Sequence, residues 1–282
     1  MTEVGYNNLA IIIVTYNPEA NLKTLLQKCS DIAGQVIVVD NNSNNTEWIK
    51  TLTVETDSLY IANSENLGIG KAINKALAQI DRSKKNWVIT FDQDSLPPDN
   101  LLEAYNYVLK NENNVGLMGV NFNPQPNDND SHIYHYHESL DQITSGLLHN
   151  VDIFNRAGMY NENLFIDCVD FEFSLRVKKN GFKTIMVDDC FLHHTIGNPK
   201  TITLGKFQIS SMNHSAFRQY FIVRNHIWLA KKYFKFFPSY IINKFYHLFI
   251  RLTKTVLIDD DKKSKIKQIH RGICDGFKSN MD

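Results

Sequence analysis

The sequence predicts an α/β fold in which parallel strands of one sheet are joined by crossover helices. In the first half of the chain, short apolar runs rich in β-branched residues alternate with longer amphipathic segments. Each apolar run also ends in a cluster of polar residues. In sheets of this kind, ligands bind outside the carboxyl ends of the strands. These polar clusters are therefore the first candidates for a binding site.

The elements of the first half follow from the spacing of apolar residues. A continuous run of four to six apolar residues bounded by turn residues is typical of a buried strand. Apolar residues on one face at helical spacing are typical of an amphipathic helix. The expected strands are Leu9–Val14, Gln35–Val39, Leu59–Ala62 and Trp87–Phe91, and the expected helices are Ala20–Ser30 and Gly68–Ile80.

The second half is less regular. Asn121–Ser139 is rich in Asn, Asp, Pro and His without an apolar period, which predicts a long loop over a site. Gln142–Asp152 and Lys183–His194 are expected strands that flank a helix near Phe171–Lys179. From Ser215 onward the pattern is helical. We therefore expect a catalytic domain over residues 1–214 and a C-terminal helical region over residues 215–282.

Composition excludes several classes of protein. The 282 residues contain 30 Lys and Arg and 30 Asp and Glu, so no global field attracts nucleic acid or membrane. The four cysteines form no CxxC pair, which favours free thiols in a reducing cytosol over a zinc site or disulfides. The N-terminus has no signal-peptide pattern, and no apolar stretch is long enough to span a bilayer. We expect a cytoplasmic protein.

The strongest chemical signal is Asp92-Gln93-Asp94 at the end of a buried strand. Two carboxylates on one face of a strand suit a hard divalent cation, which neutralises a diphosphate leaving group. The alternative is a strand-terminating turn before Pro97-Pro98. The motif alone favours the turn, but its place after the other polar strand ends favours a metal and nucleotide-diphosphate site.

Two further clusters are ambiguous. Asp40 closes the second strand, where a carboxylate accepts hydrogen bonds from a base or ribose, although Asp40 and Thr15–Pro18 are also good turn formers. Asn66–Lys71 carries two glycines at the start of a helix, where backbone amides and Lys71 favour anions. That segment is neither GxGxxG nor a P-loop, so a plain helix start is at least as well supported.

Three acidic residues precede Arg176. Attack by a hydroxyl group needs a base, and one of Asp167, Asp170 and Glu172 can serve as it. The alternative is helix capping by Asp167 with Asp170 in the first turn, and both readings can hold together. His193-His194 ends another apolar run, and only one of two adjacent strand residues faces a given side. A single histidine is more often structural than a metal ligand.

The order of these motifs resembles family 2 glycosyltransferases of the GT-A fold. A later set is similar to the bacterial rhamnosyltransferase branch of that family. The resemblance covers about Leu9 to Asn225 and implies a Rossmann-like mixed sheet flanked by helices, with a C-terminal helical extension. The matching segments are Val14–Pro18, Val38–Ser43, Asn66–Asn74 and Phe91–Asp94 for the family, and Glu162–Glu172, Leu175-Arg176 and His194–Gly197 for the branch.

Carried over by position, the resemblance implies a site for a nucleotide and a metal. The cofactor would be Mg or Mn, bound beside the diphosphate. The implied nucleotide-binding residues are Thr15, Tyr16, Asn17, Asp40, Asn66, Gly68, Lys71, Asp92 and Gln93, and the implied metal site is Asp92, Asp94 and His194.

The resemblance also places Asp170 at the position of the family's catalytic base. Many relatives have Glu-Asp there, whereas this chain has Val169-Asp170, which leaves Asp167 and Glu172 as weaker rivals. Ser145-Gly146 resembles the segment beneath the donor sugar and acceptor. Arg224-Asn225, after Tyr220, resembles a helix motif that closes over the site. The implied sugar-contacting residues are Ser145, Gly146, Asp167, Glu172 and Arg224.

The implied reaction is inverting transfer of L-rhamnose from dTDP-β-L-rhamnose to a hydroxyl of a lipid-linked bacterial surface polysaccharide or O-antigen. Donors linked to UDP or GDP are the alternatives. A non-catalytic nucleotide-sugar-binding protein of the same fold is a further rival, disfavoured by Asp170 and the two acidic residues of Asp92-Gln93-Asp94. A dinucleotide oxidoreductase is disfavoured because no GxGxxG follows the first strand.

The segment Tyr233–Leu257 mixes aromatic and aliphatic residues with lysine and arginine, and Pro238 is expected to separate two helices. One interpretation is an interfacial surface on the cytoplasmic face of the inner membrane, where a lipid-linked acceptor lies. The other is a packed helical hairpin or a homodimer interface. The sequence favours neither.

Overall fold

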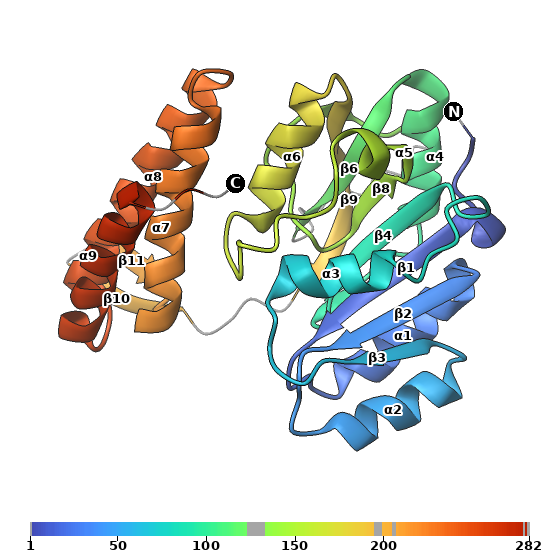
Figure 1. Ribbon diagram of the computed structural model, residues 1–282, viewed down its shortest axis with the longest axis horizontal. Coiled ribbons are helices and arrows are strands. Elements are labelled where there is room, and N and C mark those ends of the chain that lie inside the picture. Colours follow the sequence, from blue (N-terminus) through green and yellow to red (C-terminus); the bar gives the residue numbers. More distant parts are fainter. Residues whose placement is uncertain (1, 123–132, 195–198, 205–206, 279, 281–282) are drawn as a thin grey trace. The chain divides into compact units, whose positions relative to one another are not determined.

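The computed structural model describes residues 2–122, 133–194, 199–204, 207–278 and 280 (Figure 1). The chain forms two compact units. Unit 1 comprises Met1–Glu162 and Val169–Thr195, and unit 2 comprises Asn163–Cys168 and Ile196–Asp282. The predicted functional division between residues 214 and 215 stays a prediction, because compactness does not show which residues catalysis needs.

Unit 1 is built around a mixed sheet with the strand order β3-β2-β1-β4-β8-β6-β9-β5, and β7 also pairs with β9. The first four strands of this order are parallel, as predicted, whereas β8 runs antiparallel to both β4 and β6. The strands are β1 Leu9–Thr15, β2 Gln35–Asp40, β3 Leu59–Ala62, β4 Trp87–Asp92, β5 Ser95–Leu96, β6 Val115–Phe122, β7 Tyr136–Glu138, β8 Leu147–Asn150 and β9 Lys183–His194.

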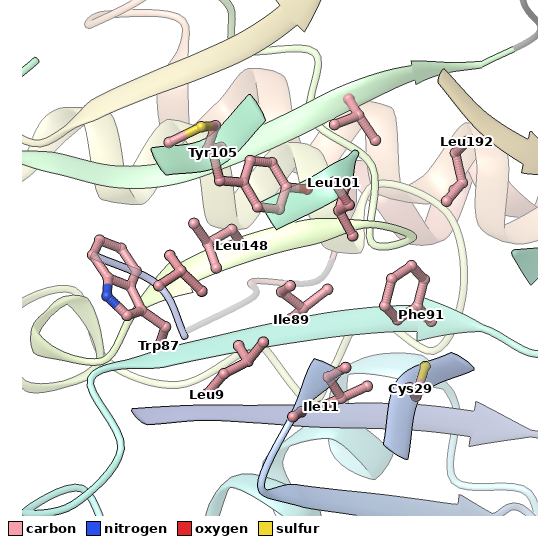
Figure 2. Close-up of a cluster of buried hydrophobic side chains, with 14 of the residues drawn as sticks. Leu9, Ile11, Cys29, Trp87, Ile89, Phe91, Leu101, Tyr105, Leu148 and Leu192 are labelled. Atoms are coloured by element: carbon pink, nitrogen blue, oxygen red, sulfur yellow. The ribbon is translucent and has the colours of Figure 1, made fainter. Parts of the chain in front are cut away.

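Helices cover both faces of this sheet, which explains why β1 is buried along almost its whole length. Alternate residues Leu9, Ile11 and Ile13 point to one face and join a core with the helices α1 and α4. Figure 2 shows Trp87, Ile89 and Phe91 of β4 in the same layer. The helices of unit 1 are α1 Asn21–Ile32, α2 Thr46–Glu55, α3 Ile69–Leu77, α4 Leu101–Asn111, α5 Asp152–Arg156 and α6 Val169–Lys179.

Two predictions for the second half of unit 1 are wrong. Asn121–Ser139 is not one long loop, because β6 extends to Phe122 and Tyr136–Glu138 forms β7 on β9; residues 123–132 lie outside the described part. Gln142–Asp152 is a strand only over Leu147–Asn150. Before that strand, the side chain of buried Gln142 donates to Ile185 O at 3.1 Å. A side chain here makes a bond to β9 that a backbone N–H would make in a regular strand.

Unit 2 is mostly helical, as predicted from Ser215 onward. The Ser215 side chain caps α7 by accepting from the backbone N–H of Arg218 at 3.3 Å, and Pro238 starts α8 as expected. The sequence analysis missed an antiparallel hairpin before these helices. No helix in the described part of the chain has the length and apolar character to cross a membrane. The elements are β10 Lys200–Leu204, β11 Phe207–Ser211, α7 Ala216–Tyr233, α8 Pro238–Ile258 and α9 Lys262–Lys278.

Helices α7 and α9 approach closely because two glycines of α9, one turn apart, face α7. A Cβ at Gly272 would lie 2.7 Å from the carbonyl oxygen of Tyr220. A Cβ at Gly276 would lie 2.9 Å from the Cβ of Ile227. Even a methyl group at either glycine therefore requires the two helix backbones to separate.

We predict that Gly272→Ala lowers the free energy of unfolding of unit 2 by about 1–3 kcal/mol, because overpacking at a backbone contact cannot be relieved by a side chain. Hydrogen exchange of α7 and α9 measures this directly. Gly5→Ala is the control, because a Cβ at Gly5 meets nothing within 4 Å and its φ of −154° suits alanine. Equal protection of the α7 and α9 amides from exchange in both variants would show that a methyl group fits between the two helices, and would contradict the prediction.

Candidate functional site

The neighbouring strands β2, β1 and β4 end within one residue of the same level in the sheet. In the parallel pairing of β1 with β2, Thr15 lies opposite Asp40. In the pairing of β1 with β4, Val14 lies opposite Asp92. The polar residues predicted from three separate strand ends therefore lie along one edge of the sheet.

Asp40 organises the loop that follows β2. Its carboxylate is buried and accepts four hydrogen bonds, from Ser43 N at 3.0 Å, Ser43 Oγ at 2.5 Å, Thr46 Oγ1 at 2.9 Å and Tyr60 Oη at 2.9 Å. Burial and the bond to Asp40 raise the pKa of Tyr60 to about 12, so this phenol stays a donor. The geometry agrees with the turn-forming interpretation of Asp40, and its contact with a nucleoside stays a prediction.

The loop after β1 is bonded to that loop. Asn17, in a left-handed conformation, donates its backbone N–H to Ser43 Oγ at 2.8 Å, and its side-chain oxygen accepts from Asn44 N at 2.8 Å. Thr15 is buried, and its hydroxyl lies 3.4 Å from Val39 O. Tyr16 is half exposed and thus the residue of this loop most available to a planar ligand such as a base.

Gln93 joins the end of β4 to the end of β1. The backbone N–H of Tyr16 donates to Gln93 Oε1 at 2.7 Å, and Gln93 Nε2 donates back to Tyr16 O at 3.2 Å. This reciprocal pair brings together two residues that the sequence analysis placed in the nucleotide site.

The segment Ser145-Gly146 lies beside the end of β4, and its predicted place beneath the donor sugar stays a prediction. The backbone N–H of Asp92 donates to Ser145 Oγ at 3.2 Å. The N–H of Gly146 donates to Thr90 O at 2.8 Å, and its φ of +69° is a conformation that favours glycine. On the other side, Ser95 pairs with His194 in the β5–β9 ladder, although the His194 side chain and residues 195–198 lie outside the described part.

The glycines of Asn66–Lys71 have separate roles. Gly68 precedes α3 with φ +80° and ψ 174°, a conformation almost confined to glycine, and its N–H donates to Asn66 Oδ1 at 3.0 Å. Gly70 permits close packing, since a Cβ there would lie 3.1 Å from Asn161 O. Lys71 is half buried on α3, and no other described residue bonds to its ammonium group. This charge is available to a ligand.

The three acidic rivals near α6 have different surroundings. Glu172 is fully buried and ion-paired with Arg176 at 2.8 Å. Asp167 is ion-paired with Arg218 at 3.0 Å within unit 2. Asp170 lies in the first turn of α6, is partly exposed, and accepts from Phe171 N at 2.9 Å. The assignment of Asp170 as the base stays a prediction.

An aromatic stack that the sequence analysis missed connects α6 to β4. The rings of Phe173 and Tyr160 are stacked with centroids 4.1 Å apart. Tyr160 Oη lies 2.7 Å from His149 Nε2, and His149 Nδ1 lies 3.1 Å from Val88 O. Burial lowers the pKa of His149 to about 4, so the ring is neutral. Nδ1–H then donates to Val88 O and Nε2 accepts from Tyr160.

Tyr160 is fully buried beside these rings. Burial raises its pKa well above the usual value, the charge of Asp170 raises it further, and the charge of Arg176 opposes this, so the phenol stays protonated. Asn74 holds the backbone of Tyr160 through two hydrogen bonds of 2.9 Å, from Tyr160 N and to Tyr160 O. An asparagine on the otherwise apolar face of α3 was the signal in the sequence for this contact.

Asp92 and Asp94 are both partly exposed at the end of β4. No three His, Cys, Asp or Glu residues in the described part gather into a ready-made metal site. Carboxylates are among the ligands that Mg²⁺ takes, together with phosphates and water. The role of Asp92 and Asp94 as cation ligands stays a prediction.

Arg224 lies on α7 in unit 2, where its guanidinium stacks 4.3 Å from the ring centroid of Trp228. It donates to Asn163 O at 3.1 Å. These contacts attach Arg224 to the loop that leads toward Asp170 in the sequence, and its contact with a sugar stays a prediction.

Comparison with known proteins identifies similarities over most of the chain. The family model described as "Glycosyl transferase family 2" matches residues 10–179. The chain is 30% identical to the dTDP-rhamnosyl transferase RfbF of Shigella flexneri, over 95% of this chain and 93% of that protein. It is 23% identical to the low-salt glycan biosynthesis hexosyltransferase Agl10 of Haloferax volcanii, over 79% of this chain and 77% of that protein.

Solved structures show the fold. The mannosyltransferase PcManGT from Pyrobaculum calidifontis, in complex with GDP-Man and Mn²⁺, has a TM-score of 0.59 at 15% identity, over 95% of this chain and 74% of its own. GalNAc-T7 with UDP, GalNAc and Mn²⁺ has a TM-score of 0.58 at 11% identity over 84% of this chain, which spans half of that protein's chain. The mixed sheet with flanking helices is the GT-A fold, as predicted.

We predict that acid destabilises the folded chain between pH 6.5 and pH 4. The pKa of buried His149 is lowered from 6.5 to about 4, so the unfolded chain binds a proton in this window that the folded chain does not. Stability from this group is fully present above pH 6.5 and is lost as the pH falls toward 4.

His149→Gln tests this assignment, because an amide keeps one donor and one acceptor but does not titrate. The melting temperature of the variant should fall less than that of the wild type when the pH is lowered from 7 to 5. Some loss should remain, since burial also lowers the pKa of His214 and His226 to about 4. An identical fall in melting temperature in both proteins would show that His149 does not contribute to acid destabilisation.

Proposed function

The chain belongs to glycosyltransferase family 2, and we propose that it transfers L-rhamnose from dTDP-β-L-rhamnose to a hydroxyl of a bacterial surface glycan, with inversion at the anomeric carbon. One set of contacts carries the proposal: the packing of Phe173 on Tyr160 and the bonds from Tyr160 through His149 to Val88 join α6, which carries Asp170, to β4, which ends at Asp92. A carboxylate for each half of a displacement reaction is therefore available in unit 1.

In the proposed step, the acceptor hydroxyl oxygen attacks C1 of rhamnose while the bond from C1 to the diphosphate oxygen breaks. Asp170 takes the hydroxyl proton, and dTDP leaves with the bonding electrons. A single in-line displacement turns the β-linked donor into an α-L-rhamnoside. The rings of Phe173 and Tyr160 stack at 4.1 Å, and Phe173 lies one turn after Asp170 on α6. In the proposed step, this packing holds the helix that carries the base, and a well-oriented base lowers the barrier to transfer.

The nucleotide would lie along the edge formed by β2, β1 and β4. Half-exposed Tyr16, held by Gln93, offers a ring face to the base. Lys71 and the N-terminus of α3 favour the negative diphosphate. Asp92 and Asp94 would hold Mg²⁺ or Mn²⁺. When bound, the cation supplies charge neutralisation for the departing diphosphate.

Rhamnose as the donor sugar is supported by the similarity to the RfbF protein, which extends over nearly the full length of both chains. The direct test is a panel of dTDP-rhamnose, UDP-sugars and GDP-sugars, with release of the nucleoside diphosphate as the readout. We predict turnover of dTDP-rhamnose above the others, and its loss when EDTA removes the cation. Preferred turnover of a UDP- or GDP-sugar would overturn the assignment of the donor.

We predict that Asp170→Asn retains dTDP binding and loses transfer, because the amide has the same shape but takes no proton. A fall in kcat of about 100-fold or more is expected for loss of a general base. Glu172→Gln is not a suitable control, since Glu172 is buried against Arg176. Asp141→Asn is a better one, because Asp141 is exposed outside this cluster. Full transfer by Asp170→Asn would remove Asp170 as the base.

We propose that unit 2 contacts the anionic membrane surface where a lipid-linked acceptor lies. The segment from 190 to 258 has ten lysine and arginine residues and no aspartate or glutamate. On α8, six exposed apolar side chains share one face of the helix, as in helices that lie in a membrane interface. The stripe consists of Ile242, Phe245, Tyr246, Phe249, Val256 and Leu257.

We predict that the wild type floats with vesicles containing anionic lipid, and that Lys235→Glu, Lys244→Glu and Lys254→Glu together abolish flotation. Each basic residue near an anionic surface contributes about 1 kcal/mol. The matched control reverses Lys50, Lys84 and Lys110, which lie in unit 1 and change the net charge equally. Failure of the wild type to float would contradict membrane contact. Dimer mass in light scattering would then assign the stripe to a homodimer interface.

A further inference from the structure

The loop Asn163–Cys168, which directly precedes α6, has an unusual backbone. Asp167 and Cys168 both adopt left-handed conformations, with φ of 61° and 63°. Residues other than glycine adopt this conformation at a cost, and two in succession are held only where neighbouring groups enforce it. Asp170 follows only two residues later, in the first turn of α6.

Asn225 of α7 provides such a restraint. Its side chain is completely buried, and Nδ2 donates to two successive carbonyl oxygens of the loop, Ile166 O and Asp167 O, each at 2.8 Å. Its Oδ1 accepts from Arg224 Nε at 3.0 Å, which fixes the orientation of the amide. One carboxamide therefore satisfies two backbone carbonyls at the left-handed turn.

Other residues of α7 support the same loop. Arg218 binds the Asp167 carboxylate with two nitrogens, at 3.0 Å and 3.2 Å. Cys168 Sγ lies 3.3 Å from His226 Nδ1, and both side chains are buried. Side chains of α7 thus contact the side chains of Asp167 and Cys168 as well as the two carbonyls that Asn225 binds.

We propose that Asn225 is a positioning residue for the transfer reaction: it fixes the left-handed turn at Asp167–Cys168, and so the backbone conformation of the two residues that directly precede Val169 and Asp170 along the chain. Without its two hydrogen bonds, the turn relaxes toward ordinary backbone conformations. This inference rests on the proposed role of Asp170 as the base.

The kinetic test is Asn225→Asp, which keeps the size of the side chain but replaces the double donor with an acceptor. We expect kcat to fall about 10- to 100-fold, as for other small misplacements of a catalytic group, with dTDP affinity unchanged. The control is Gln219→Ala, which removes a buried amide of the same helix that bonds to Thr255 and does not touch the loop. An equal fall in kcat for both variants would reduce Asn225 to a general stabiliser of α7.

A second readout does not depend on activity. Cys29, Cys168 and Cys190 are buried, so Cys274→Ser removes the one partly exposed thiol. In that background, Asn225→Asp should make Cys168 react faster with a thiol reagent, located by mass spectrometry, while Cys29 stays protected. Unchanged protection of Cys168 would overturn the proposal. If Asp170→Asn were active but Cys168 became reactive in Asn225→Asp, the loop restraint would stand and the assignment of the base would fall.

Discussion

The site depends on the register of three parallel strands. Thr15 lies opposite Asp40 and Val14 opposite Asp92, so three loops leave the sheet at one level. A shift of one residue in either pairing would turn buried side chains to the other face, and the core under α1 and α4 opposes such a shift. Burial of aliphatic side chains such as Ile11 and Ile89 therefore determines where the polar residues of the site meet.

A second constraint brings α6 to this edge. Asp170 and Asp92 are 78 residues apart in sequence and lie on a helix and a strand. The chain of contacts from Phe173 through Tyr160 and His149 to Val88 connects these two elements. Because His149 stays neutral and Tyr160 stays protonated, this connection adds no charge between two carboxylates. The chain belongs to glycosyltransferase family 2, and in the proposed transfer reaction these two carboxylates act on the leaving group and on the acceptor.

Local patterns predicted much of this protein, and long-range contacts explain what they missed. Apolar runs and turn residues are local patterns. They predicted the strand Leu59–Ala62 and the position of Asp92-Gln93-Asp94 at the end of a buried strand. The spacing of apolar residues does not show which residues far apart in sequence are in contact. It could mark Asn74 as unusual on its helix, but it could not identify Tyr160 as its partner. The ion pair of Glu172 with Arg176 was open to prediction, because the two residues stand at the helical spacing of such a pair. The hairpin β10–β11 was missed because its strands are short and polar.

The central claim is that the end of β4 and the start of α6 serve one bound donor. Hydrogen exchange with dTDP-rhamnose and Mn²⁺ measures this most directly, because it needs no acceptor. The account predicts slower exchange both at residues 92–96 and at the first amides of α6, with dTDP alone slowing chiefly the strand ends. Protection of the strand ends by the intact donor, with unchanged exchange at the start of α6, would contradict it.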